Sequence, residues 1–226
     1  MVWDNQPANS VDIWNMALDC IGENESIELE TEERLSAEVC RRHYDNIVRR
    51  AFEAVPWPFA VKQATLSSPS GVTRTGWEYI YTLPTDCAIP LALLGEDQRV
   101  GLFTPDNRFP FDIQMSESGT WKVLCCDLAA DDFEVLEYVA YSEYVLGYPA
   151  QLVDAIQYGL AAKLAFSVAK NPQLAGAMIQ LRNQALSEAR AQAFQTRQHD
   201  PEPITDSVAA RGGNDSLYGR SRLRWP

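Results

Sequence analysis

The chain has 226 residues, of which 46% are hydrophobic, and its formal net charge is −12 at pH 7. This size and composition are typical of a globular, soluble protein with one or two domains around a substantial core. They argue against a membrane protein, since no apolar stretch approaches the ~20 residues of a membrane span, and against direct gripping of a nucleic-acid backbone, since acidic excess repels phosphate. The first residues lack the basic and apolar regions of a secretory signal, so we expect the chain to fold in a cytoplasm.

The acidic residues are concentrated near the N-terminus. No Lys or Arg occurs before Arg34, and residues 19–33 contain seven acids. The simplest interpretation is a solvated acidic surface. A more specific interpretation is the acidic wall of a channel, along which DNA passes without sticking.

The chain contains five cysteines but no CxxC pair and no Cys/His spacing that suits zinc. We predict reduced, mostly buried thiols and no metal site. The adjacent Cys125 and Cys126 would point to opposite faces of a strand. This arrangement favours one buried thiol and one edge thiol over a redox pair.

Two helices are predicted in the first 55 residues. The first begins with Ser10 as its N-cap and ends at Gly22, because apolar residues recur between them at helical spacing. The second begins with Thr31 as its N-cap, carries two glutamates in its first turn and ends at Pro56. Its expected length is about 36 Å. Its apolar stripe consists of Leu35, Cys40, Tyr44, Ile47, Val48, Ala51, Phe52 and Val55.

The periodicity changes from helical to alternating between Ala60 and about Tyr144, which predicts an inserted β-rich region. Three segments indicate strands, at 77–83, 121–125 and 133–139. Turn signals separate them, at 69–71, 83–86, 104–107 and 118–119. A small antiparallel sheet or sandwich fits this pattern best.

Helical spacing returns after residue 150. The segment 152–168 predicts one helix, and Asn171-Pro172 ends it and begins the next, with Asn as N-cap and Pro at the first helical position. The fourth helix is predicted to reach about Gln198, with an alanine-rich face that allows close helix packing. That face consists of Leu174, Ala177, Met178, Leu181, Ala185, Ala189 and Ala193.

The predicted fold class is α+β, mainly α: an antiparallel helical bundle with an inserted small antiparallel β domain and an extended C-terminal tail. The expected segments are 1–59 and 147–198 for the helices, 60–146 for the β-rich domain and 199–226 for the tail. The tail is rich in proline and glycine, which argues against a place in the core. Because it ends in arginines and Trp225, two interpretations stay open: a disordered tail, or a docking arm that orders on a partner.

Catalytic chemistry is not predicted. We interpret His43 as a solvated residue of the second helix and His199 as an exposed residue at the end of the fourth helix, rather than as catalytic bases. No nucleophile elbow, zinc motif, P-loop or dinucleotide-binding motif occurs, so we assign no catalytic, cofactor-binding or metal-binding residue. An acid pair of the glycosidase type stays open, because only the separation of two carboxylates in space would reveal it.

Three segments, taken in order, carry a resemblance to a known family. The first runs from Ala37 through Pro56-Trp57-Pro58-Phe59-Ala60 to Leu66, and the second is 77–87. The third comprises the Leu- and Ala-rich segment 152–169 and the following helix with Ala189-Arg190-Ala191. Together they resemble the head-to-tail adaptor proteins of tailed bacteriophages, the group that includes tail tubular protein A of short-tailed phages. The resemblance covers nearly the whole chain.

This resemblance implies a non-enzymatic structural protein, made in the host cytoplasm, that forms a ring beneath the portal at the virion neck. Such a ring, expected to be a dodecamer, connects the capsid to the tail and lines the DNA channel. The implied partners are other copies of the chain, the portal protein and a tail or nozzle protein. DNA would pass without specific binding, and the resemblance implies neither a cofactor nor a membrane.

In such adaptors the C-terminal segment docks on the portal. The resemblance therefore assigns the portal contact to Leu217, Tyr218, Arg220, Arg222, Leu223, Arg224 and Trp225. Two alternatives stay open. The chain could be a virion adaptor that also hydrolyses cell wall through an acid pair, or an acidic intracellular regulator that binds another protein through Trp225 and its neighbours.

Overall fold

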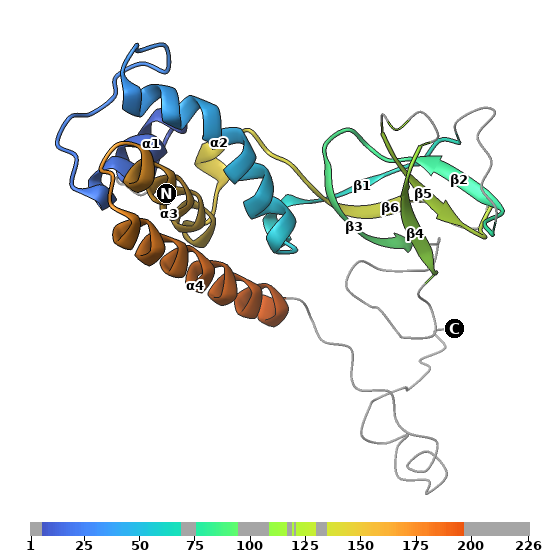
Figure 1. The fold of residues 1–226 in the computed structure, drawn as a ribbon. Helices are drawn as coiled ribbons and strands as arrows, with labels where there is room; N and C mark the ends of the chain where they lie inside the picture. Colours follow the sequence, from blue (N-terminus) through green and yellow to red (C-terminus); the bar gives the residue numbers. More distant parts are fainter. Residues whose placement is uncertain are drawn as a thin grey trace, which may run out of the picture.

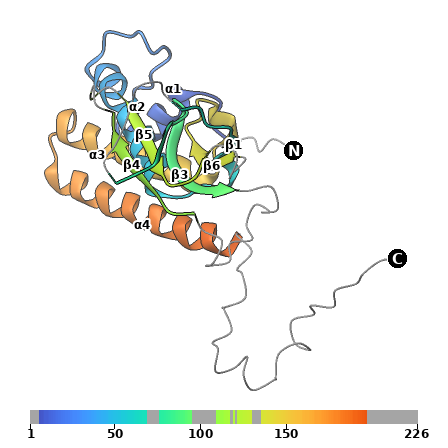
Figure 2. The same cartoon turned by 90° about the vertical axis from the view of Figure 1, so that its right-hand side faces the viewer.

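The computed structural model describes residues 6–68, 76–94, 109–116, 119, 121–129 and 135–196. Within these ranges the protein is mixed α and β, with four α-helices and two small antiparallel sheets. The helices lie at one end of the molecule and the strands at the other (Figure 1). The view turned by 90° accordingly places the strands in front of the helices (Figure 2). No helix in the described ranges is long and apolar enough to cross a membrane.

Helix α1 spans Ser10–Ile21. Its N-cap is Asn9, whose side-chain oxygen accepts a hydrogen bond from the Asp12 backbone N–H at 3.0 Å, while the Asp12 carboxylate accepts one from the Asn9 N–H. The predicted cap, Ser10, was wrong by one residue, because the Ser10 hydroxyl instead donates to Glu30 in the following loop. Gly22 ends the helix with a φ of 76°, which confirms the predicted left-handed stop.

Helix α2 spans Leu35–Ala54 and is shorter than predicted. Its 20 residues give a length of about 30 Å. The helix begins after Arg34 and not after Thr31, because the Glu32 carboxylate accepts hydrogen bonds from loop N–H groups instead of lying in a first helical turn. Leu35, predicted in the apolar stripe, is 58% exposed.

The chain leaves α2 through a short junction to the strands. Trp57 is buried, and its indole Nε1 donates a hydrogen bond to the Ala51 carbonyl at 3.0 Å. This bond folds the chain back onto the last turn of α2, and the short 3-10 helix η1, Pro58–Ala60, then leads directly into the first strand. Phe59 contacts Trp57 and Phe52 through its ring and is partly exposed.

In the described part of the chain, six strands form two sheets, and every pairing between them is antiparallel. One sheet has the order β1-β6-β3 and the other the order β2-β5-β4. The bounds are Val61–Ala64 for β1, Tyr79–Thr82 for β2, Cys87–Leu94 for β3, Phe111–Met115 for β4, Lys122–Cys126 for β5 and Val135–Ala140 for β6. Strands β2, β5 and β6 confirm the three predicted segments: β2 and β6 are shorter than predicted, and β5 has the predicted length but is shifted by one residue.

The two sheets pack against each other around a common apolar cluster. Tyr81 and Leu124 of one sheet and Leu93 and Leu136 of the other belong to this cluster. Strand β3 was not predicted, because its sequence does not alternate and contains Pro90. The strand lies at the edge of its sheet, where proline is tolerated, and its register shifts between Pro90 and Ala92.

The five cysteines are free, as predicted, and three of them are buried. Cys125 and Cys126 do point to opposite faces of β5, since they belong to different apolar clusters. The prediction of one edge thiol was wrong: both side chains are fully buried, because β5 is the central strand of its sheet and both of its faces are covered. Burial also raises the pKa of the Cys40 thiol to about 12, so this thiol is inert at neutral pH.

After β6, the short 3-10 helix η3, Val145–Gly147, leads into α3, Ala150–Ser167, and α4 follows at Pro172–Thr196. Helix α3 packs against α1, α2 and α4. Asn171 caps α4 as predicted, since its side-chain oxygen accepts the Leu174 N–H at 3.1 Å. The buried face of α4 consists of Ala175, Met178, Ala185, Leu186, Ala189 and Ala193.

Part of the predicted α4 face was wrong. Ala177 and Leu181 are exposed, because the face that meets α3 is offset by one residue and places the Arg182 stem over Gly159. This offset brings the arginines of α4 to the boundary with α2.

Candidate interaction surfaces

The predicted portal contacts and His199 lie in 197–226, outside the described residues. Within the described residues, three surfaces combine geometry with unsatisfied charge or hydrogen-bonding capacity: an acidic loop, an arginine groove and an aromatic cleft. The sequence predicted only the acids of the loop, as a solvated surface or as a channel wall.

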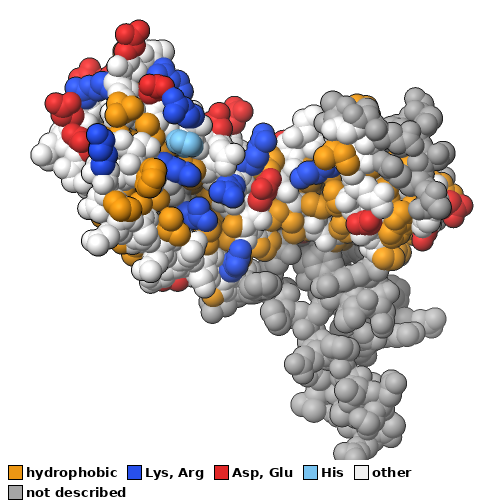
Figure 3. All heavy atoms as spheres, in the orientation of Figure 1, with side chains coloured by type: hydrophobic (Ala, Val, Ile, Leu, Met, Phe, Trp, Pro, Cys, Tyr) orange, Lys and Arg blue, Asp and Glu red, His pale blue; other side chains and the backbone are white. Residues whose placement is uncertain are grey.

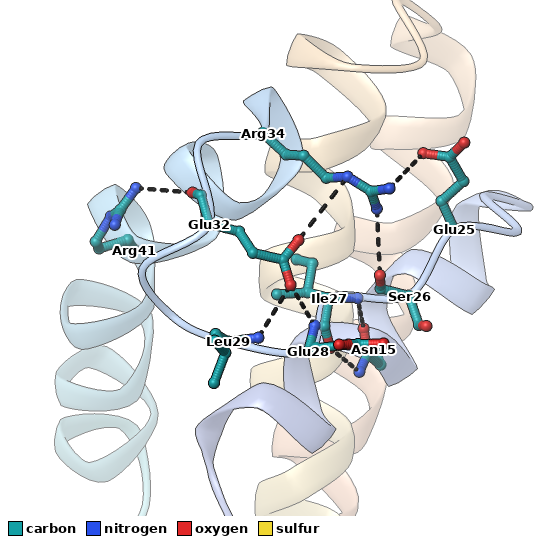
Figure 4. Close-up of polar contacts among 9 residues, drawn as sticks. All are labelled: Asn15, Glu25, Ser26, Ile27, Glu28, Leu29, Glu32, Arg34 and Arg41. Carbon is teal, nitrogen blue, oxygen red and sulfur yellow. Dashed lines mark hydrogen bonds and ion pairs between the residues drawn. The ribbon is translucent and has the colours of Figure 1, made fainter.

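The acidic loop, residues 23–34, connects α1 to α2 and is tied to α1 at its centre. Ile27 is 2% exposed. The Asn15 side chain donates to the Ile27 carbonyl at 2.9 Å and accepts from the Ile27 N–H at 2.8 Å, so it satisfies both backbone groups (Figure 4). The buried side chain and this pair of bonds fix the middle of the loop on α1.

The loop is closed by its own charged residues. The Glu32 carboxylate accepts hydrogen bonds from the N–H groups of Glu28 and Leu29, and these bonds lower the pKa of Glu32 (Figure 4). Arg34 forms an ion pair with Glu25 at 3.1 Å and donates to the Ser26 carbonyl at 3.2 Å. Arg41 of α2 donates to the carbonyls of Glu30 and Glu32. The segment is therefore an ordered loop.

The outer side of the acidic loop presents groups without partners. Leu29 is 64% exposed. The carboxylates of Glu28 and Glu33 are exposed and make no hydrogen bond or ion pair within the described part of the chain. A leucine between free carboxylates, held on an ordered loop, is suited to contact another surface.

The arginine groove lies between α2 and α4, with α3 beneath it. It is defined by Arg50, Arg182 and Arg190 around an apolar floor of Ile47, Ala51 and Leu186, and its volume is about 400 Å³. Figure 3 shows the Lys and Arg side chains gathered over this region, across the middle of the helical part. Such a concentration of positive charge is notable in a chain whose net charge is −12.

Both walls of the groove, α2 and α4, approach Gly159 of α3 closely. A Cβ atom at Gly159 would lie 2.9 Å from Ile47 Cγ2 and 3.3 Å from Arg182 Cδ. Arg190 spans the two helices, since its Nε donates to the Ala54 carbonyl at the end of α2 at 2.9 Å. This contact satisfies one of the free carbonyls of the helix terminus and fixes one side of the groove.

His43 lies on the same side of α2 as the basic residues. The imidazole is partly buried, and burial, then Lys163 and Arg42, lower its pKa. It is therefore neutral at pH 7 and adds no charge to this surface. No acidic partner that would orient it as a catalytic base is recorded among the described residues.

The aromatic cleft lies where the helices meet the strands. Its volume is about 750 Å³, and its walls include Trp14, Tyr44, Tyr141, Tyr144 and Tyr148. The Trp14 Nε1 and the Tyr44 hydroxyl are buried and find no hydrogen-bond partner in the described part of the chain. Burial raises the pKa of Tyr148 to about 12. The cleft thus offers stacking surfaces and two unused polar groups.

In the described ranges, no group of three or more His, Cys, Asp or Glu residues could hold a metal ion. One pair of carboxylates does interact. Asp154 of α3 has a raised pKa, caused first by burial and then by Glu188 of α4.

Sequence reasoning could have found part of these surfaces. The charges of residues 23–34 were visible as an acidic run, and the arginines of α2 as flanks of its apolar stripe. The groove could not be found, because it joins residues 47–54 to residues 182–190.

The chain matches no family model and no curated protein.

Proposed function

We propose that this chain is a structural head-to-tail adaptor of a tailed bacteriophage, which forms a ring under the portal and connects the capsid to the tail. The observation that carries the proposal is the junction between the helices and the strands. The chain passes from α2 through Trp57 straight into β1, and returns from β6 through residues 141–149 to α3. A β region inserted between two pairs of helices is the arrangement that the resemblance implies.

The finer architecture belongs to the same proposal. In it the four helices form an antiparallel bundle, residues 60–146 form the inserted β domain, and residues 199–226 form an extended docking arm. The packing of α1, α2 and α4 on α3 supports the bundle, because one central helix then buries a face of each of the others.

Each part of the chain then has its own contact in the virion neck. The helices contact neighbouring copies in the ring, and the β domain contacts the tail or nozzle protein. The tail contacts the portal through the residues from Leu217 to Trp225. The acidic surface repels DNA, so that DNA slides through the channel without specific binding.

The proposal is tested by mixing the protein with purified portal. Mass determination by light scattering, with and without portal, should reveal a higher assembly, and electron micrographs of the mixture should show a ring on the portal. Failure to assemble under both conditions would count strongly against an adaptor.

The docking arm is tested by deleting residues 200–226. We expect the shortened chain to keep its helical circular dichroism and to lose portal binding. A point variant, Trp225→Ala, keeps the arm at full length and removes only the Trp225 side chain, so it tests whether that side chain anchors the arm. Aromatic and arginine side chains dominate most interfaces. Portal binding that survives the deletion unchanged would refute this part of the proposal.

A further inference from the structure

We propose that the acidic loop of one copy of the chain binds the arginine groove of a second copy. Leu29 would lie on the apolar floor of the groove, and the carboxylates of Glu28 and Glu33 would pair with its arginines. The inference rests on the proposed ring-forming function, and it names the two surfaces through which neighbouring subunits contact each other.

The groove lacks counter-charge. Arg50 and Arg182 form no ion pair with a carboxylate in the described ranges, and the Arg182 Nε is buried without a hydrogen-bond partner there. The one acid of the groove, Glu53, already accepts the Tyr141 hydroxyl at 2.6 Å. Three arginines against one glutamate leave a formal charge of +2, which favours an anionic occupant.

The acidic loop supplies the matching groups in a fixed geometry. Glu28 and Glu33 are exposed and unpaired within the described part of the chain, and Leu29 of the same loop is 64% exposed. Asn15, Glu32 and Arg34 hold the loop in place, so little conformational freedom is lost on binding. An ordered loop of this kind binds more tightly than a flexible acidic segment would.

The occupant comes from another copy, because the loop is held elsewhere on its own chain. Asn15 of α1 binds both backbone groups of Ile27, and Arg41 of α2 binds the carbonyls of Glu30 and Glu32. No residue of the loop lines the groove of its own chain. A contact between two different surfaces of identical chains is head-to-tail, and repetition of such a contact closes a ring or extends a filament.

A protein segment fits the groove better than a nucleic-acid backbone does. Phosphate binding uses exposed cations and gains nothing from an apolar floor. Here Ile47, Ala51 and Leu186 line the groove together with the arginines, and such apolar side chains suit a leucine. Occupation by the acidic loop would also neutralise the arginines, which is consistent with a channel that does not retain DNA.

The test is a charge-reversal experiment on the full chain. The loop variant carries Glu28→Lys and Glu33→Lys, and the groove variant carries Arg50→Glu and Arg190→Glu, all at exposed positions. Sedimentation velocity at protein concentrations up to about 1 mM measures self-association, because even weak contacts are populated there. We expect each variant alone to associate at least tenfold more weakly than the wild type, since like charges then face each other.

Mixing the two variants should restore association. The reversed loop of one variant then meets the reversed groove of the other, and the two unchanged surfaces also meet. A control variant, Lys122→Glu with Lys170→Glu, makes the same change in net charge as the groove variant, at exposed positions outside the groove. It should associate with itself like the wild type, which separates loss of the groove contact from a general change in net charge. Circular dichroism confirms that each variant is folded.

Several results would overturn the inference. These are a wild type that stays monomeric at every concentration, association that both reversals leave unchanged, or a mixture that does not recover. Retention of duplex DNA that the groove variant alone loses, with unchanged self-association, would assign the groove to nucleic acid instead. Portal mixtures separate the two proposals: restored association without a ring on the portal overturns only the adaptor function, whereas a portal ring that neither reversal affects overturns only the loop contact.

Discussion

Gly159 of α3 lies directly beneath Ile47 of α2, so closely that a Cβ atom at Gly159 would lie 2.9 Å from Ile47 Cγ2. The same atom would lie 3.3 Å from Arg182 Cδ of α4. Gly159 therefore sets how closely α2 and α4, the two walls of the arginine groove, approach α3. The absence of a side chain there lets the three helices approach one another.

Gly159→Ala should destabilise the protein. Alanine favours a helix over glycine by about 1 kcal/mol, but the added methyl group collides with a β-branched side chain, and overpacking of this kind costs roughly 1–3 kcal/mol. We expect the free energy of unfolding to fall by about 1 kcal/mol, measured by urea denaturation. The matched control is Gly176→Ala in α4, where no atom lies within 4 Å of the added Cβ. It should raise stability by about 0.5–1 kcal/mol, and equal effects of the two substitutions would contradict the packing argument.

Asn15→Ala should release the acidic loop. The substitution leaves the N–H and carbonyl of the buried Ile27 without partners, which costs about 1–3 kcal/mol in the free energy of unfolding. Hydrogen exchange at the Ile27 amide should become faster than in the wild type. Asn46→Ala is the control, because Asn46 is exposed on α2. Unchanged exchange at Ile27 would show that other contacts hold the loop.

The helices and three of the strands, β2, β5 and β6, could be predicted because their local patterns agree with their final environment. The apolar spacing of α1, the Asn171-Pro172 boundary and the alternation around Tyr79–Thr82 all depend on neighbouring residues. The start of α2 could not be predicted, because Glu32 is an ordinary first-turn residue until Arg34 folds back to Glu25 and closes the loop.

The candidate surfaces were harder to predict, for the same physical reason. An arginine beside an apolar stripe reads as a solvated flank of one helix. That reading changes only when a second helix places Arg182 and Arg190 opposite Arg50. The offset of the α4 face by one residue decides this arrangement, and it depends on the fit of α4 to Gly159.

Trp57→Phe should weaken the junction between the helices and the strands. The variant keeps an aromatic ring but loses the hydrogen bond from Nε1 to the Ala51 carbonyl, which is 3.0 Å long and buried. We expect a loss of about 1–2 kcal/mol in the free energy of unfolding, measured by chemical denaturation. Trp121→Phe serves as the control, since Trp121 is 45% exposed and its replacement should change stability by no more than about 0.5 kcal/mol. Similar losses for both variants would contradict a specific role for the junction bond.

Asp154→Asn should stabilise the protein at neutral pH. Burial, and then Glu188, raise the pKa of Asp154 above its ordinary value of 3.8. A raised pKa in the folded state means that the folded chain holds the proton more tightly than the unfolded chain. The resulting stabilisation is present below about pH 3.8 and is lost as the pH rises through the raised pKa. At pH 7 the ionised carboxylate therefore opposes folding, and the amide removes that opposition.

Thermal unfolding of both proteins between pH 3 and pH 8 measures this effect. Because Asp154 is partly exposed, solvent screens its charge, and we expect Tm to rise by only about 1–2 °C at pH 7. The difference should disappear at pH 3, where both side chains are neutral. The control is Asp45→Asn at an exposed position of α2, because it also removes one negative charge from the acidic chain. A rise in Tm that is equal for both variants would assign the effect to net charge, whereas a rise confined to Asp154→Asn places it at the α3–α4 contact.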